Sequence, residues 1–362
     1  MKIAVWLTGI LLYTGMVIAQ GGRPDSSAFD YRKIYSYALD GNIRAALALV
    51  ESCPSPLSSK DRELKAEFET RFLYPADSSR YPATSSSIEE LVNLFKDYWR
   101  KSLLDTAANY DSLLMGHLAV FLAARYPAAG LDMHTPDSVV GDYLTRYLQS
   151  RHLYTAGLGK TGRLFDLLVW QYQQDTLYSF VLAGDTTTEP VTFMKDFITL
   201  GWEEYATLGK HYPGGWTTPQ SLYCVESAYD LHSEDFLISY LAHESRHYKD
   251  YILFPKLEST DLEYRAKLTE LSLARTSLFY LIGFFIDNAN AQSHNGHEAA
   301  NYCVIRDLSG RLFHQPFQKD LQAWKKLDTA AINKAAAAIL RENTALLKKK
   351  GKNVRSYVLL RS

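Results

Sequence analysis

The chain has 362 residues, enough for about two domains and a sizeable buried core. Hydrophobic residues make up 47% of it and charged residues 22%, which excludes an intrinsically disordered chain. With 39 basic and 40 acidic residues, the net charge of −1 creates no overall field that would attract nucleic acid or an anionic membrane. Neither is expected as a partner, so binding must come from local sites.

The first residues have the pattern of a secretory signal peptide. Lys2 supplies a positive start, an apolar run extends to Ala19, and Val17 and Ala19 are small residues at the positions that a signal peptidase reads. The alternative is an uncleaved membrane anchor, because about 17 apolar residues is the lower limit for spanning a bilayer. We expect cleavage after residue 19 and a secreted or periplasmic chain without a membrane attachment.

Three cysteines, Cys53, Cys224 and Cys303, follow this segment. Export permits disulfides, but the odd number leaves at least one thiol free. Their spacing matches no metal-binding pattern, so we expect one bridge or none.

The region that follows the signal segment is predicted to be helical. Residues 29–73 resemble a single tetratricopeptide-type helical hairpin, with small residues where two helices would cross. Residues 75–87 are rich in Pro, Ser, Ala and Asp and are the best linker candidate. Apolar stripes of helical period then continue to about residue 174. The predicted organisation is an N-terminal helical hairpin and linker over residues 20–87, followed by a larger domain that begins at residue 88.

Extended segments are predicted only from Leu177 onwards. A short hairpin is expected over residues 177–193, a helix over 192–208, and extended segments at 216–218 and 222–225. Long helices are expected near 233–254, 260–288 and 297–313. An alanine-rich helix from Asp328 ends in a lysine cluster, which we interpret as a solvated helix terminus. The larger domain would thus span 88–327, and residues 328–362 would form a C-terminal helix and basic tail.

The segment His243-Glu244-Ser245-Arg246-His247 contains the pattern that indicates catalytic chemistry. Residues four apart on a helix lie on the same face, so His243 and His247 would direct two imidazoles at one point. Zinc accepts such nitrogen ligands, and a catalytic zinc site keeps one position open for water. Glu244, beside them, is placed to take a proton from that water. The segment therefore predicts a zinc site with Glu244 as general base.

The surrounding residues predict the helix that this motif requires. Ser233 is a good N-terminal capping residue, and Pro255 ends the helical pattern. A match of this kind arises by chance about once in a hundred chains of this length. The competing interpretation is a pair of surface histidines.

Around the motif the chain resembles the gluzincin metallopeptidases, over about residues 216–273. The resemblance implies a thermolysin-like architecture in which a following helix supplies a glutamate as the third zinc ligand. Glu263, in a Glu-x-x-Ala segment, is the first choice, although residues 260–263 also read as a helix capping box. Glu270, seven residues further on the same face, is the competitor, and the sequence leaves this choice open.

Three neighbouring residues have less certain roles. Arg246 places a charge where the motif usually has an uncharged residue, and it could point outward or pair with Asp250. Asp250 could instead accept the second N–H of a metal-binding imidazole. His297, at the start of a later helix, matches the position from which such enzymes bring a side chain to the oxyanion, and is predicted to be catalytic. The alternative for His297 is an ordinary histidine of a loop or first helical turn.

Two glycine-containing segments resemble elements that bind ligands. Residues 214–218 could form an edge strand that pairs with an extended peptide, or only a tight turn before a strand. Residues 157–162 resemble a phosphate-binding loop, but the required first glycine is replaced by Tyr154 and no apolar strand precedes it. A phosphate site is therefore not expected there.

Together these features predict a mainly helical α+β protein with a zincin-like catalytic domain and a small sheet over the motif helix. The resemblance implies a secreted zinc metallopeptidase that binds one Zn²⁺ and hydrolyses peptides or proteins. The alternatives are a secreted helical binding protein with a non-catalytic histidine pair and a zinc hydrolase that acts on a non-peptide amide. The sequence does not define the natural substrate or the oligomeric state.

Overall fold

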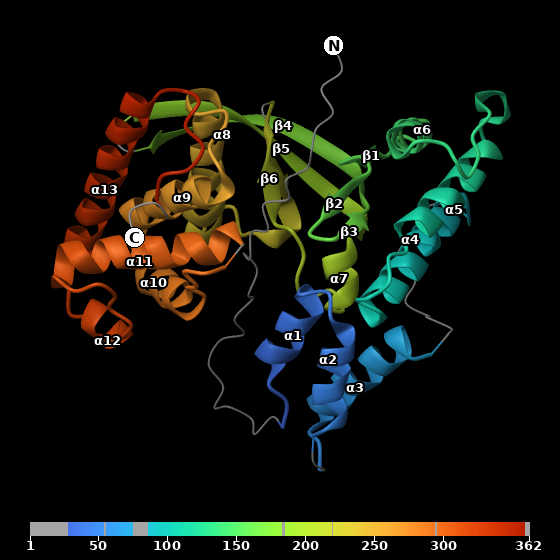
Figure 1. The fold of residues 1–362 in the computed structure, drawn as a ribbon, viewed down its shortest axis with the longest axis horizontal. Coiled ribbons are helices and arrows are strands. Elements are labelled where there is room, and N and C mark those ends of the chain that lie inside the picture. Colours follow the sequence, from blue (N-terminus) through green and yellow to red (C-terminus); the bar gives the residue numbers. More distant parts are fainter. Residues whose placement is uncertain are drawn as a thin grey trace. The chain divides into compact units, whose positions relative to one another are not determined.

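A computed structural model describes residues 28–53, 56–74, 86–182, 185–218, 220–293 and 295–358. Within them the chain is a mostly helical α+β protein with 13 α-helices, a five-stranded sheet and a two-stranded sheet, which confirms the predicted fold class (Figure 1). The predicted signal peptide lies outside the described residues. Among the described helices, none combines the length and apolar character needed to cross a bilayer. The chain divides into two compact units: unit 1 is Met1–Gln173 with Met194–Pro213, and unit 2 is Gln174–Phe193 with Gly214–Ser362.

Unit 1 is built mainly from six helices. They are α1 (Tyr31–Leu39), α2 (Ile43–Glu51), α3 (Ser59–Phe72), α4 (Ser86–Leu104), α5 (Asp111–Ala123) and α6 (Asp137–Gln149). The residues predicted to form one helical hairpin, 29–73, hold three helices, and the small side chains of Ala38 in α1 and Ala46 in α2 are fully buried. Gly41 takes a φ of 71° between the helices, which favours glycine, and the Asn42 side chain caps α2 by accepting from the Ala45 N–H.

Strands begin earlier than predicted. The chain forms β1 (Tyr154–Thr155), β2 (Gly159–Thr161), β3 (Leu164–Asp166), β4 (Leu168–Leu182) and β5 (Asp185–Leu200). The predicted continuation of helix to residue 174 is therefore wrong, as is the predicted helix over 192–208, of which only α7 (Trp202–Ala206) is helical. Alternating burial along β4 after Trp170 is consistent with a strand, but its polar glutamines hide that period in the sequence. The glycine-rich segment at 157–162 is part of the β2–β3 hairpin.

The five-stranded sheet has the order β1-β4-β5-β7-β6, where β6 is Gly215–Thr217 and β7 is Leu222–Val225. Both extended segments predicted after residue 215 are thus confirmed, and β6 is an edge strand. It pairs antiparallel with β7, with Trp216 opposite Tyr223. A Cβ atom at Gly215 would collide with the Tyr223 carbonyl and the Tyr240 ring, so glycine is what lets β6 lie this close to the helical segment carrying Tyr240.

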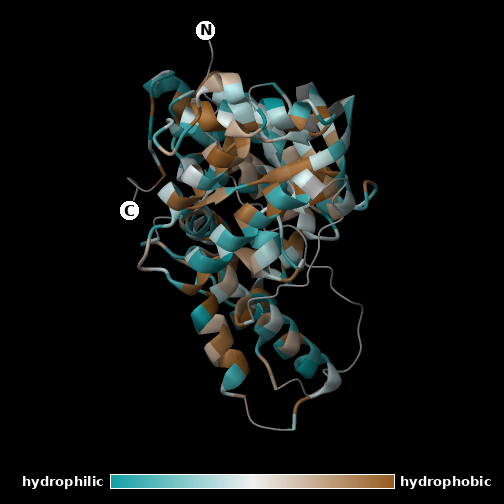
Figure 2. Cartoon of the chain, turned by 90° about the vertical axis from the view of Figure 1, so that its right-hand side faces the viewer, coloured by the Kyte–Doolittle hydropathy of each residue, from teal (hydrophilic) through white to brown (hydrophobic). Residues whose placement is uncertain are grey.

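Unit 2 consists mainly of helices, one of which is packed among the others. After a π-helical segment (Asp235–Ala242) come α8 (His243–Leu253), α9 (Ser259–Leu273), α10 (Leu278–Asp287), α11 (Gly296–Phe313), α12 (Leu321–Trp324) and α13 (Thr329–Lys350). Helix α9 contacts α8, α10, α11 and α13 (Figure 1). Figure 2 shows that the helices of the chain carry both hydrophobic and hydrophilic residues. The three cysteines are free, and the lysines at 348–350 are exposed.

The long helix predicted over residues 260–288 is divided into α9 and α10. The break is bound by the Glu234 carboxylate, which accepts hydrogen bonds from the backbone N–H groups of Arg275, Thr276 and Ser277 and from the Ser277 hydroxyl. This carboxylate supplies acceptors for the backbone N–H groups of the break itself, directly before α10 begins at Leu278. The partner lies more than 40 residues away in the chain, so local sequence patterns could not indicate the break.

Candidate metal centre

The two histidines of the motif lie at the start of α8, directly after the π-helical segment. Ser233 acts as predicted, because its hydroxyl accepts a hydrogen bond from the Phe236 N–H. The helix presents both imidazoles on the same face, and the rings approach edge to face with centroids 4.8 Å apart. Their side chains, like that of Glu263, are 1% exposed or less. The interpretation as surface histidines is therefore wrong.

Three ligand atoms from α8 and α9 converge. The Nε2 atoms of His243 and His247 are 3.0 Å apart, and the Glu263 carboxylate lies 3.5 Å from the first and 3.2 Å from the second. Metal–ligand bonds of about 2.0–2.1 Å in a tetrahedron separate ligand atoms by roughly 3.3 Å. The observed spacings match the edges of such a tetrahedron. The group could hold one metal ion, and three ligands leave the fourth position of a tetrahedral site for water or substrate.

The structure distinguishes between the two glutamates that were candidates for the third ligand. Glu263 lies beside both Nε2 atoms, whereas Glu270 Oε1 lies 2.6 Å from His243 Nδ1. Glu270 therefore occupies the place of a carboxylate that holds the imidazole from behind, fixing the tautomer with a lone pair on Nε2. The capping box proposed for residues 260–263 is not formed, because no side chain caps the start of α9.

Helix α9 is buried on every side and yet carries several charged residues, which buried positions tolerate only when paired. Arg265 makes a bidentate ion pair with Asp250 of α8, at 2.6 and 2.9 Å, and donates to Asn343 and Thr344 of α13. The suggestion that Asp250 orients a histidine is thus wrong. Its carboxylate instead fixes α8 against α9, the two helices that supply the candidate ligands.

Two cations of this region depart from the usual pattern of such motifs. Arg246 is buried and donates from Nε to the Thr269 hydroxyl at 3.1 Å, so it does not point outward. Lys267 is also buried. Its Nζ lies 3.9 Å from Glu263 Oε2 and 4.8 Å from the centroid of the Phe285 ring. The charge of Lys267 partly balances the carboxylates that gather here.

His297 lies beside the same carboxylate. Its Nδ1 is 3.0 Å from Glu263 Oε2, an ion-pair distance without hydrogen-bond alignment. Asn295 accepts from the His297 N–H, so the imidazole is held in the first turn of α11. The side chain is 21% exposed, in contrast to the buried ligand atoms. The structure thus brings His297 into the cluster, and its part in catalysis stays a prediction.

Glu244 is completely buried, and its two carboxylate oxygens differ. Oε2 accepts a hydrogen bond of 2.5 Å from the hydroxyl of Thr217 on β6. Oε1 accepts no hydrogen bond from the described residues. His247 Nδ1 likewise has no hydrogen-bond partner among them. A buried carboxylate oxygen without a donor is rare and calls for an explanation such as a bound water or a catalytic role.

Neighbouring charges shift the pKa values of two residues of this cluster. Burial lowers the pKa of His243, but Glu270 and Glu263 outweigh it and raise that pKa to about 10. Burial alone would raise the pKa of Glu263, yet the three neighbouring histidines, His297 first, hold it well below its usual range. Without a metal, the His243 ring is therefore protonated on both nitrogens at neutral pH. A metal ion that binds Nε2 must displace the proton from that nitrogen.

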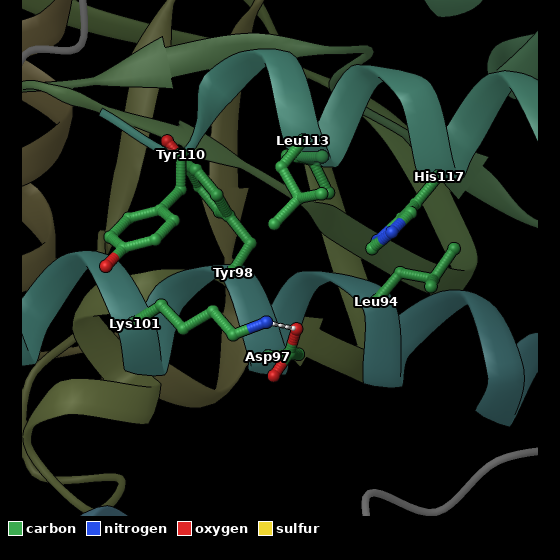
Figure 3. Close-up of a pocket in the computed structure, with 8 residues that line it drawn as sticks. Leu94, Asp97, Tyr98, Lys101, Tyr110, Leu113 and His117 are labelled. Carbon is green, nitrogen blue, oxygen red and sulfur yellow. Dashed lines mark hydrogen bonds and ion pairs between the residues drawn. The ribbon is translucent and has the colours of Figure 1, made fainter. Parts of the chain in front are cut away.

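Other clusters in unit 1 have simpler explanations. A small pocket between α4 and α5 is lined by Leu94, Asp97, Tyr98, Lys101, Tyr110, Leu113, Leu114 and His117 (Figure 3). Its volume of about 10 Å³ is room for about one water molecule and not for a substrate. Asp166 is buried, and burial raises its pKa to about 6, although N–H groups of Trp202 and Leu167 donate to it. This carboxylate accepts a hydrogen bond from the first backbone N–H group of α7.

Comparison of the chain with protein-family models, curated proteins and solved structures finds no match. The assignment therefore depends on the geometry of the cluster itself.

Sequence reasoning missed the contacts of Thr217 and Lys267. The position of Lys267 could have been anticipated, because it lies four residues after Glu263 on one helix face. No sequence signal indicates that the Thr217 hydroxyl reaches Glu244, because β6 and α8 meet only in the folded chain.

Proposed function

We propose that this protein is a zinc-dependent hydrolase of the metallopeptidase type, exported by its N-terminal signal segment. The observation that supports this most directly is the tetrahedral spacing of His243 Nε2, His247 Nε2 and the Glu263 carboxylate. Two imidazoles and one carboxylate form a donor set suited to Zn²⁺. Bound zinc would polarise a substrate carbonyl and lower the pKa of water.

The residues of the chain would carry the remaining steps. Glu244 Oε1, free of hydrogen-bond donors from the described residues, would accept the proton of the attacking water and pass it to the leaving amine. Glu270 would keep His243 in the tautomer that binds a cation. His297, the more exposed member of the cluster, would face developing negative charge on the substrate oxygen.

Peptide is the substrate class that the fold favours. Strand β6 forms an edge of the sheet, and in the described part of the sheet it pairs only with β7. Such an edge offers backbone groups to an extended peptide. Because Thr217 of this strand contacts Glu244, a peptide paired with β6 would lie beside the base.

The test combines metal content with turnover. The purified protein is expected to contain about one zinc per chain, and His243→Ala or His247→Ala should abolish the bound metal. Glu244→Gln should keep the zinc and lose at least a hundredfold in hydrolysis of a quenched fluorescent peptide library, because a general base contributes about 10²–10⁴ in rate. Undiminished hydrolysis by Glu244→Gln would contradict the mechanism, and a metal-free protein purified with zinc supplied would contradict the site.

A further inference from the structure

The hydroxyl of Thr217 makes the shortest polar contact of Glu244 that the structure shows. It lies 2.5 Å from Glu244 Oε2 and 3.2 Å from the Glu244 carbonyl oxygen. A hydroxyl carries one proton, and the shorter distance marks the carboxylate as its acceptor. The contact therefore favours one conformation of the Glu244 carboxylate.

This contact links the edge strand to the motif helix. Thr217 is the last residue of β6, and Gly215 in the same strand permits the close approach to Tyr240 that brings the strand against the helical segment. Oε1 of Glu244 has no hydrogen-bond donor among the described residues, so without the Thr217 contact at Oε2 the side chain would lose this constraint. Both residues belong to unit 2.

We propose that Thr217 is a positioning residue for the general base. Its hydroxyl holds Glu244 by Oε2 and leaves Oε1 as the oxygen that receives a proton. This inference rests on the proposed function, because it assigns Glu244 as the base. It extends that function to a residue outside the zinc motif, on the strand that would also bind the peptide backbone.

The experiment uses acetohydroxamate, which binds zinc when its N-hydroxyl proton passes to a nearby base and therefore reports on Glu244 without turnover. Thr217→Val removes the hydroxyl while nearly keeping the shape. We expect zinc affinity to stay within twofold, acetohydroxamate affinity to fall about tenfold by calorimetry, and kcat for peptide hydrolysis to fall while KM stays similar. Thr217→Ser, which keeps the hydroxyl, should restore the acetohydroxamate affinity and kcat.

Two controls separate positioning from simple destabilisation. Thr218→Val removes the neighbouring hydroxyl, which among the described residues bonds within the turn to Ser221 and Gln220, and should leave acetohydroxamate affinity unchanged. In a Glu244→Gln background, Thr217→Val should have no further effect, because its action passes through the carboxylate. Equal acetohydroxamate affinity in Thr217→Val and the parent protein, or failure of Thr217→Ser to restore it, would overturn the inference alone. A zinc-loaded parent protein that binds no acetohydroxamate would overturn the proposed function as well.

Discussion

At the residue scale, Glu270 shows how a side chain that is not a ligand can govern the metal site. Its Oε1 lies 2.6 Å from His243 Nδ1. Glu270→Gln removes the charge that makes the imidazole a better ligand, so zinc affinity should fall about 10–100-fold in competition with a chelator. Glu258→Gln, at the exposed start of the same helix, should leave the affinity unchanged. An equal loss in both variants would show that net charge, not this contact, is responsible.

Glu203 in unit 1 gives a pH-dependent prediction. Burial first, and the charge of Asp166 second, raise its pKa well above the usual range. The unfolded chain ionises this carboxyl at about pH 4.3, whereas the folded chain keeps it neutral, so its contribution favours folding most below that pH and declines as pH rises. A tenfold change in proton affinity corresponds to about 1.4 kcal/mol.

Replacing Glu203 by glutamine should therefore stabilise unit 1 at pH 7 and have little effect at pH 4. Urea unfolding at the two pH values measures the difference. A variant that is less stable than the parent protein at both pH values would contradict this prediction, since it would mean that the carboxyl is needed in the fold.

At the element scale, helix ends depend on groups supplied from elsewhere in unit 2. Burial alone would raise the pKa of Glu234, but the Ser277 hydroxyl and three backbone N–H groups lower it to about 2. A lowered folded-state pKa means that the stabilisation is present above about pH 4.3 and is lost as pH falls towards 2.

Glu234→Gln should cost about 1 kcal/mol at pH 7, because it weakens the cap of α10 and its interaction with the helix dipole. The difference from the parent protein should shrink as pH approaches 2, as followed by urea unfolding. Glu258→Gln is again the matched control, with little expected change. A pH-independent cost would contradict the role of the carboxylate charge.

At the scale of the whole molecule, metal binding should be coupled to the stability of unit 2. Helices α8 and α9 supply the candidate ligands, so zinc would join two elements that the Asp250–Arg265 ion pair already connects. Free zinc at a hundred times Kd stabilises the folded state by about 2.7 kcal/mol. For a unit of this size that corresponds to a rise in Tm of roughly 5–10 °C.

Scanning calorimetry with and without zinc measures this shift. The His243→Ala variant should show none, and the parent protein should release protons on binding, because His243 has a pKa of about 10 without the metal. A shift of the same size in His243→Ala would place the zinc elsewhere.

The sequence by itself determined the features that depend on short-range spacing. The motif helix follows from the positions of Ser233, His243 and His247, because a helix fixes the relative direction of residues four apart. The extended segments around Trp216 and the helices α11 and α13 follow from local periodicity in the same way. Both candidate carboxylates could be named, since they occupy one face of the next helix.

Only the tertiary structure decided which groups meet across elements. The rotation of α9 against α8 places Glu263 beside the Nε2 atoms and Glu270 behind His243, and packing of whole helix faces sets that rotation. The same packing of helix faces brings Asp250 into an ion pair with Arg265. The break before α10 and the contact of Thr217 with Glu244 join residues at least 27 positions apart, whose proximity arises from burial of the core around them and not from any local pattern.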